Sequence, residues 1–181
     1  MKPWQIIRSQ VLLDRQPWLR LVVQDVRLSN GRVIEGYLLA QAREYAMTFA
    51  LTDQGRVPLV QQYKHGLGKL SYDLPAGYLD AGEEPLACAQ RELREETGYV
   101  ADDWRHLLSV VLDSNRGNTR AHLFLARGAR QVAMPHLDDT EDLATQFLAP
   151  GEILEMIRSG EMDSIPSVAC ALLAADVLCR T

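Results

Sequence analysis

The residues with the clearest capacity for chemistry are three glutamates within five positions, Glu92, Glu95 and Glu96. At 100° per residue along a helix, their side chains fall within an arc of about 100°. Carboxylates about 5 Å apart repel by about 3 kcal/mol per pair at an effective dielectric constant of about 20. Such an arc requires a compensating positive charge, and hard divalent cations prefer carboxylate oxygens. The spacing therefore makes a Mg²⁺ site for phosphate chemistry a candidate. Such a string by itself is more often a charged, solvated helix face, and the wider pattern around it decides between the two.

The element that must position these glutamates is a helix beginning near Pro85 and ending before Gly98. Proline suits a first helical turn, and glycine suits the position after the last one. Leu86, Ala89 and Leu93 follow the helical period and predict one buried stripe beside the carboxylates.

The rest of the chain predicts a sheet-rich protein whose other helices lie near the C-terminus. Asn30-Gly31 is a strong hairpin signal because both residues tolerate positive φ. Residues 64–71 contain two glycines and predict a loop. Residues 72–78 predict a short extended segment with a bend forced by Pro75 and Gly77. Predicted strands cover residues 6–13, 18–28, 32–39, 45–51, 57–63, 104–112, 121–126 and 143–148, and predicted helices cover 151–159 and 164–179. This order predicts an α+β fold or a three-layer α/β/α arrangement.

Composition limits the classes of protein that remain. The 181 residues suffice for about one domain with a small extension, and 47% hydrophobic residues exclude wholesale disorder. The formal charge of −5 disfavours binding to nucleic acid, which needs a basic face. The three cysteines and four histidines form no disulfide framework or metal-ligand spacing, which favours a reduced, cytoplasmic location. We expect no signal peptide, because residues 1–10 contain no long apolar stretch, and no membrane span, because the apolar run 168–178 is too short.

A longer pattern surrounds the three glutamates. Gly77, Glu83, Arg91, Glu92, Leu93, Glu95, Glu96 and Gly98 match Gly-x5-Glu-x7-Arg-Glu-U-x-Glu-Glu-x-Gly-U, where U is a bulky apolar residue. This pattern resembles the Nudix box, with the aromatic Tyr99 where an aliphatic residue is usual. The resemblance implies a Nudix hydrolase, which cleaves a nucleoside diphosphate linked to another group with the help of a divalent metal. It also implies the Nudix fold, an α/β/α sandwich with a mixed central sheet between helices.

The resemblance assigns a role to individual residues of the box. Mg²⁺ or Mn²⁺ would be the cofactor, and the implied metal ligands are the carbonyl of Ala76 and the carboxylates of Glu92, Glu95 and Glu96. Arg91 would orient Glu95 or Glu83 through a salt bridge. Gly77 and Gly98 would serve backbone geometry.

The segments Val60-Gln-Gln-Tyr-Lys64 and Asp73-Leu-Pro-Ala-Gly77 are similar to those that precede the box in ADP-ribose and ADP-sugar pyrophosphatases. Lys64 stands where arginine is common and Asp73 where glutamate is common. The likeness implies that residues 1–40 are a β extension for homodimerisation and that residues 41–181 are the hydrolase domain. A proline common past the box in ADP-ribose enzymes is missing from residues 113–119. Other nucleotide sugars, dinucleotides and a non-catalytic nucleotide sensor therefore remain alternatives.

Candidate substrate contacts lie outside the box. Lys64 and Arg116 could bind phosphates, and Trp18 could stack on a base; solvated arginines and packing or interface aromatics are the alternatives. A general base is expected in the acidic loop before residues 143–148, because metal-bound glutamates are poor bases. Glu141 ranks first and Asp139 second for this role, with a solvated acidic loop as the alternative.

Overall fold

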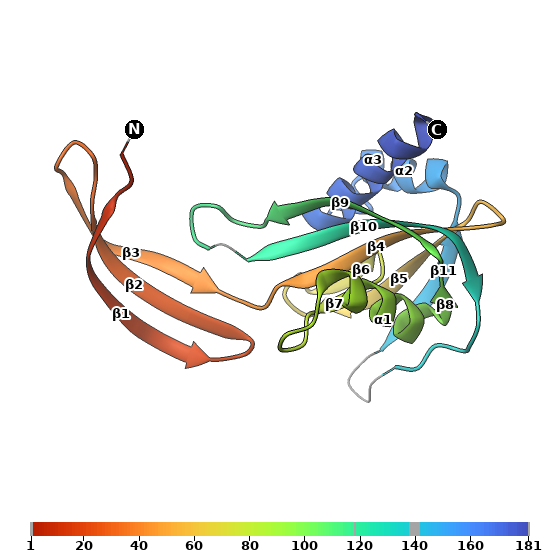
Figure 1. Cartoon of the computed structure of the whole chain (residues 1–181), viewed down its shortest axis with the longest axis horizontal. Coiled ribbons are helices and arrows are strands. Elements are labelled where there is room, and N and C mark those ends of the chain that lie inside the picture. Colours follow the sequence, from red (N-terminus) through yellow and green to blue (C-terminus); the bar gives the residue numbers. More distant parts are fainter. Residues whose placement is uncertain (1, 118, 138–141, 181) are drawn as a thin grey trace. The chain divides into compact units, whose positions relative to one another are not determined.

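The computed structural model describes residues 2–117, 119–137 and 142–180 (Figure 1). The chain divides into two compact units. The N-terminal unit comprises Met1–Glu44 and Val111–Arg120, and the second unit comprises Tyr45–Val110 and Ala121–Thr181. The boundary expected at residue 40 lies four residues before Glu44, where the first segment of the N-terminal unit ends. The second segment of this unit, residues 111–120, comes from later in the sequence.

The N-terminal unit is an antiparallel sheet of three strands, β1 (Gln5–Arg15), β2 (Leu19–Arg27) and β3 (Val33–Gln41), in the order β1-β2-β3. The predicted hairpin between β2 and β3 is confirmed, and Gly31 has φ +85°. A backbone hydrogen bond links the later segment of this unit to β3: the amide of Ala40 donates to the carbonyl of Arg116 at 2.6 Å.

The second unit is built on a mixed central sheet. Its strands are β4 (Tyr45–Thr52), β7 (Ala76–Tyr78), β8 (Tyr99–Val100), β9 (Asp103–Val111) and β10 (Arg120–Gln131). The order is β7-β4-β10-β8, and β9 also pairs with β10. The sheet is mixed because β4 and β10 run parallel while β7 and β8 pair antiparallel with their neighbours.

A smaller sheet in the same unit has the order β11-β5-β6, formed by β11 (Leu143–Leu148), β5 (Val57–Lys64) and β6 (Lys69–Asp73). The predicted loop over residues 64–71 was therefore wrong in part, because Lys64 pairs with Lys69 and closes a hairpin. The extended segment predicted over residues 72–78 belongs to two strands in two sheets. Pro75 separates them, since proline has no N–H to continue a ladder.

Helices cover both faces of the central sheet (Figure 1). On one face α1 (Pro85–Thr97) contacts β4, and on the other α3 (Ile165–Cys179) contacts β4 and α2 (Pro150–Ser159). The larger core lies between the sheet and α2 and α3, and includes Phe49, Leu123, Leu125, Ile153 and Ala171. The predicted α+β fold, with a mixed sheet between helices, is confirmed.

Candidate active site

Helix α1 carries Arg91, Glu92, Glu95 and Glu96, and its ends match the sequence signals. Pro85 occupies the first turn, and Gly98 ends the helix in the left-handed conformation with φ +76°. Ala89 and Leu93 are buried against the sheet as predicted. Leu86 was wrongly placed in that stripe: it is 40% exposed, because it lies in the first turn at the rim of an open pocket.

Arg91 is the centre of the site. Its guanidinium donates through Nε and Nη2 to both oxygens of Glu83, each at 2.9 Å. Nη1 donates to Glu92 at 2.6 Å and to Glu95 at 3.0 Å, and Nη2 also donates to the carbonyl of Tyr78 at 3.1 Å. The expectation that Arg91 pairs with Glu95 or Glu83 understated its contacts, because it holds both carboxylates and Glu92 as well.

Electrostatics favour the charged forms of Glu83 and Arg91 in this ion-pair network. The hydrogen bond from Arg91 lowers the pKa of Glu83 to about 2, and the amide of Asp80 contributes in the same direction. The hydrogen bond with Glu83 in turn raises the pKa of Arg91. Burial raises the pKa of the Cys88 thiol to about 12, so this buried cysteine remains protonated and takes no part as a nucleophile.

Ala76, just before the box, and Gly77, its first residue, lie against two carboxylates of α1. The amide of Ala76 donates to Oε2 of Glu96 at 2.9 Å. At Gly77, an added Cβ would lie 1.9 Å from Cδ of Glu92, so only glycine leaves room for that carboxylate. Glu92 and Glu96 are 8% and 4% exposed. The structure thus brings the segment before the box and the helix glutamates into direct contact.

The carboxylate cluster, defined as Glu83, Glu92, Glu95 and Glu96, carries three more formal charges than Arg91 offsets. Its oxygen donors fit a hard divalent cation such as Mg²⁺ or Mn²⁺. Within the described ranges, no group of three or more His, Cys, Asp or Glu side chains is already arranged around a metal position. Arg91 holds three of the four carboxylates, and the Ala76 amide holds the fourth.

The acidic loop that contains Glu141 and Asp139 falls outside the described residues, and both of those candidates with it. The described residues on either side are bonded to the last turn of α1. The amide of His136 donates to the carbonyl of Glu95 at 2.8 Å, and the Thr145 hydroxyl donates to the carbonyl of Glu96 at 3.2 Å.

The predicted substrate contacts divide between the two units. Lys64 belongs to the unit that contains α1, where its Nζ lies 3.9 Å from Asp73. Trp18 and Arg116 belong to the N-terminal unit. The Trp18 ring is 65% exposed and has the guanidinium of Arg43 5.9 Å from its centroid.

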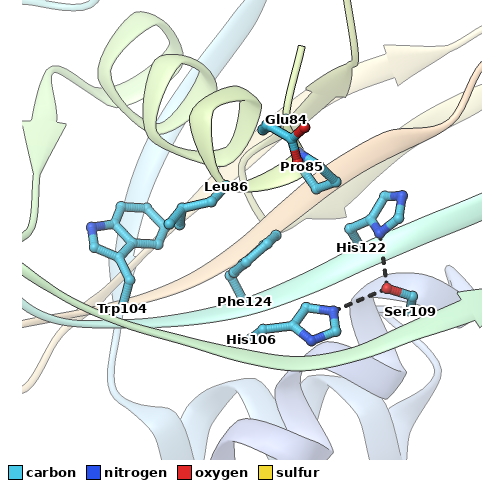
Figure 2. Close-up of a pocket in the computed structure, with 8 residues that line it drawn as sticks. All are labelled: Glu84, Pro85, Leu86, Trp104, His106, Ser109, His122 and Phe124. Carbon is cyan, nitrogen blue, oxygen red and sulfur yellow. Dashed lines mark hydrogen bonds between the residues drawn. The ribbon is translucent and has the colours of Figure 1, made fainter. Parts of the chain in front are cut away.

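Sequence reasoning missed a polar link between β9 and β10 (Figure 2). The Ser109 hydroxyl lies 3.0 Å from Nε2 of His106 and 2.8 Å from Nδ1 of His122. These residues line an open pocket of about 410 Å³ together with Glu84, Pro85, Leu86, Trp104 and Phe124. A spacing of 16 residues between the histidines gives no signal in sequence, because strand pairing brings them together.

Comparisons with known proteins agree with this geometry. The sequence model of the NUDIX domain matches residues 42–168. The chain is 32% identical over 148 residues to the ADP-ribose pyrophosphatase of Mycobacterium tuberculosis, covering 81% of this chain and 70% of that protein. It is 29% identical over 169 residues to the GDP-mannose pyrophosphatase of Citrobacter koseri, covering 87% of each.

A crystal structure of an ADP compounds hydrolase superposes with a TM-score of 0.86, covering 98% of this chain and 95% of that one, at 19% identity. That likeness concerns the fold. Taken with the family match, it shows that the chain belongs to the Nudix family and is a Nudix hydrolase. None of the described helices combines the length and the apolar character needed to cross a membrane.

Proposed function

We propose that this enzyme hydrolyses the pyrophosphate bond of ADP-ribose or a related nucleotide sugar, releasing a nucleoside monophosphate and a sugar phosphate. The observation that carries the proposal is the carboxylate cluster, in which Arg91 holds Glu92 and Glu95 while the Ala76 amide holds Glu96. The segments around Lys64 and Asp73, and the relatives named for ADP-ribose and GDP-mannose, support a nucleotide sugar.

Glu92, Glu95, Glu96 and the carbonyl of Ala76 would hold Mg²⁺ or Mn²⁺. When bound, such a cation supplies positive charge to the pyrophosphate and lowers the pKa of a coordinated water. Arg91 keeps Glu83 ionised and orients Glu92 and Glu95, a positioning role supported by its two hydrogen bonds to Glu83. Lys64, whose side chain is 41% exposed, binds a substrate phosphate as a point charge.

Glu141 is the general base, with Asp139 second. The proposal is supported by the bonds from His136 and Thr145 to the carbonyls of Glu95 and Glu96, which tie both sides of the acidic loop to α1. Kinetics on Glu141→Gln and Asp139→Asn decide the point. A large loss of turnover with metal affinity intact marks the base, a loss of metal affinity marks a ligand, and full activity in both variants removes the loop from the mechanism.

The enzyme acts in the cytoplasm as a homodimer built on the N-terminal sheet. Both edges of this sheet, β1 and β3, carry apolar side chains that a second copy would cover. The exposed side chains on these strands are Ile6, Ile7, Val11, Leu12, Val33 and Leu38, and Trp4 just before β1 is also exposed. Trp18 and Arg116 of this unit would contact the nucleotide.

A panel of substrates tests the assignment. Purified protein with Mg²⁺ should release AMP from ADP-ribose. The rates of hydrolysis of GDP-mannose, other nucleotide sugars and dinucleotides then show which substrate the enzyme prefers. A protein that binds ADP-ribose and turns over no member of the panel is a sensor, the second candidate. The full set of box glutamates favours the enzyme over that candidate.

A further inference from the structure

A buried hydrogen bond joins α3 to the strand that leads into the box. The Ser167 hydroxyl donates to Oδ1 of Asp73 at 2.7 Å, and the two residues are 0% and 7% exposed. The other carboxylate oxygen of Asp73 faces the Lys64 ammonium at 3.9 Å. Each oxygen of this buried carboxylate therefore has its own polar neighbour.

A carboxylate in this position needs an explanation beyond packing. Taking an ionised carboxylate out of water costs free energy that its partners must offset, whereas an apolar side chain would fill the same space without that cost. Asp73 ends β6 directly opposite Val60, and the chain then crosses to β7 in the central sheet. The Asp73–Ser167 hydrogen bond therefore lies where the backbone passes from one sheet to the other. At this point no continuous ladder of strand hydrogen bonds holds the backbone in place.

Each of the three residues after Asp73 forms a hydrogen bond through its backbone. The Leu74 amide points at the Ser167 hydroxyl at 3.4 Å, and the carbonyl of Pro75 accepts from the Thr48 amide at 2.9 Å. The next amide, of Ala76, donates to Glu96 in α1 at 2.9 Å. Ser167 on one face of the central sheet is thus connected to Glu96 on the other through four consecutive residues.

We propose that Asp73 and Ser167 are positioning residues of the active site. Their hydrogen bond holds the crossing segment, residues 74–77, against α3, so that the Ala76 backbone meets Glu96 and Gly77 leaves room for Glu92. The consequence for catalysis rests on the proposed function, whereas the positioning itself does not. A charge-assisted hydrogen bond suits this role because it is roughly twice as strong as a neutral one.

Amide hydrogen exchange measures the positioning directly. In Ser167→Ala and Asp73→Ala, the amides of Leu74, Ala76 and Gly77 should exchange at least roughly tenfold faster than in wild type. Asp73→Asn keeps an oxygen that accepts from Ser167 and should retain most of the protection. Cys170→Ala is the matched control, because Cys170 is a fully buried residue one turn later in α3 whose Sγ contacts the carbonyl of Phe124 instead of this segment.

Mn²⁺ affinity, followed by electron paramagnetic resonance, and kcat should both fall by roughly tenfold or more in Ser167→Ala, with the circular dichroism spectrum unchanged. The proposal is overturned if amide exchange in the crossing segment is unchanged in Ser167→Ala, or if it is equally accelerated in the Cys170→Ala control. It is also overturned if Ser167→Ala exchanges faster but keeps the Mn²⁺ affinity and kcat of wild type. If wild type itself neither binds Mn²⁺ nor turns over a nucleotide, the proposed function fails, and the exchange data alone then decide whether the pair positions Ala76.

Discussion

Replacing Gly77 with alanine should disable the active site while leaving the fold intact. A Cβ at this position would lie 1.9 Å from Cδ and Oε1 of Glu92 and 2.4 Å from Oε2, whereas ordinary contact begins at about 3.4 Å. The φ of Gly77 lies outside the left-handed region, so the backbone itself accepts alanine. The clash therefore falls on the far end of one side chain and not on the main chain.

The magnitude follows from that distance. The Glu92 carboxylate must move by at least about 1.5 Å, the difference between 1.9 Å and roughly 3.4 Å. This movement would break its 2.6 Å contact with Arg91 and take it away from the proposed metal position. A misplacement of about 1 Å costs roughly 100-fold in rate, so kcat should fall by about that much or more.

Stability should change little. Gly→Ala at a compatible φ stabilises by about 0.4–1 kcal/mol through the unfolded state, and losing a partly exposed ion pair costs a similar amount. The two effects nearly cancel, and Tm should stay within a few degrees of wild type.

The assay is AMP release from ADP-ribose with Mg²⁺, beside a thermal melt. Gly66→Ala is the control, because Gly66 has no positive φ and an added Cβ there meets no atom within 4 Å. A double variant, Gly77→Ala with Glu92→Gln, should be no worse than the more damaged single variant, since both act through one carboxylate. Near-normal turnover in Gly77→Ala, or additive losses in the double variant, would refute the reasoning.

Three further predictions concern the same site and the N-terminal sheet. Glu92→Gln and Glu96→Gln should each lower kcat/KM by orders of magnitude with Tm retained, and an active, folded Glu96→Gln variant would contradict the metal assignment. Because the folded pKa of Glu83 is about 2, below its ordinary 4.5, its carboxylate stabilises the fold above about pH 4.5, and this contribution is lost as pH falls toward 2. Urea unfolding of Glu83→Gln should therefore show a deficit of about 1–2 kcal/mol at pH 7 that shrinks between pH 4.5 and 2, and a constant deficit would contradict this assignment. Light scattering should give about 41 kDa, twice the 20.3 kDa chain, and a monomer at working concentrations would count against the homodimer.

The elements that sequence patterns predicted well are those specified by local signals. Helix α1 begins at Pro85 and ends before Gly98 as expected, because proline and glycine act on their own φ angles. A bend at Pro75 and Gly77 was expected, but the placement of β6 and β7 in two different sheets was not, because the partner strand is chosen by hydrogen bonds to distant residues. Leu86 followed the helical period and is nonetheless exposed, since burial depends on what lies opposite the first turn.

The sequence by itself determined the candidate carboxylates, because Glu92, Glu95 and Glu96 share one helix and its period places them on one face. Only the tertiary structure decided what surrounds them. Arg91 in α1 binds Glu83, which precedes the helix, and the amide of Ala76 in β7 donates to Glu96. Ser167 donates to Asp73, 94 residues earlier in the chain. The physical reason is that side-chain spacing along a helix is set by the covalent chain, whereas contacts between elements depend on how sheets and helices pack.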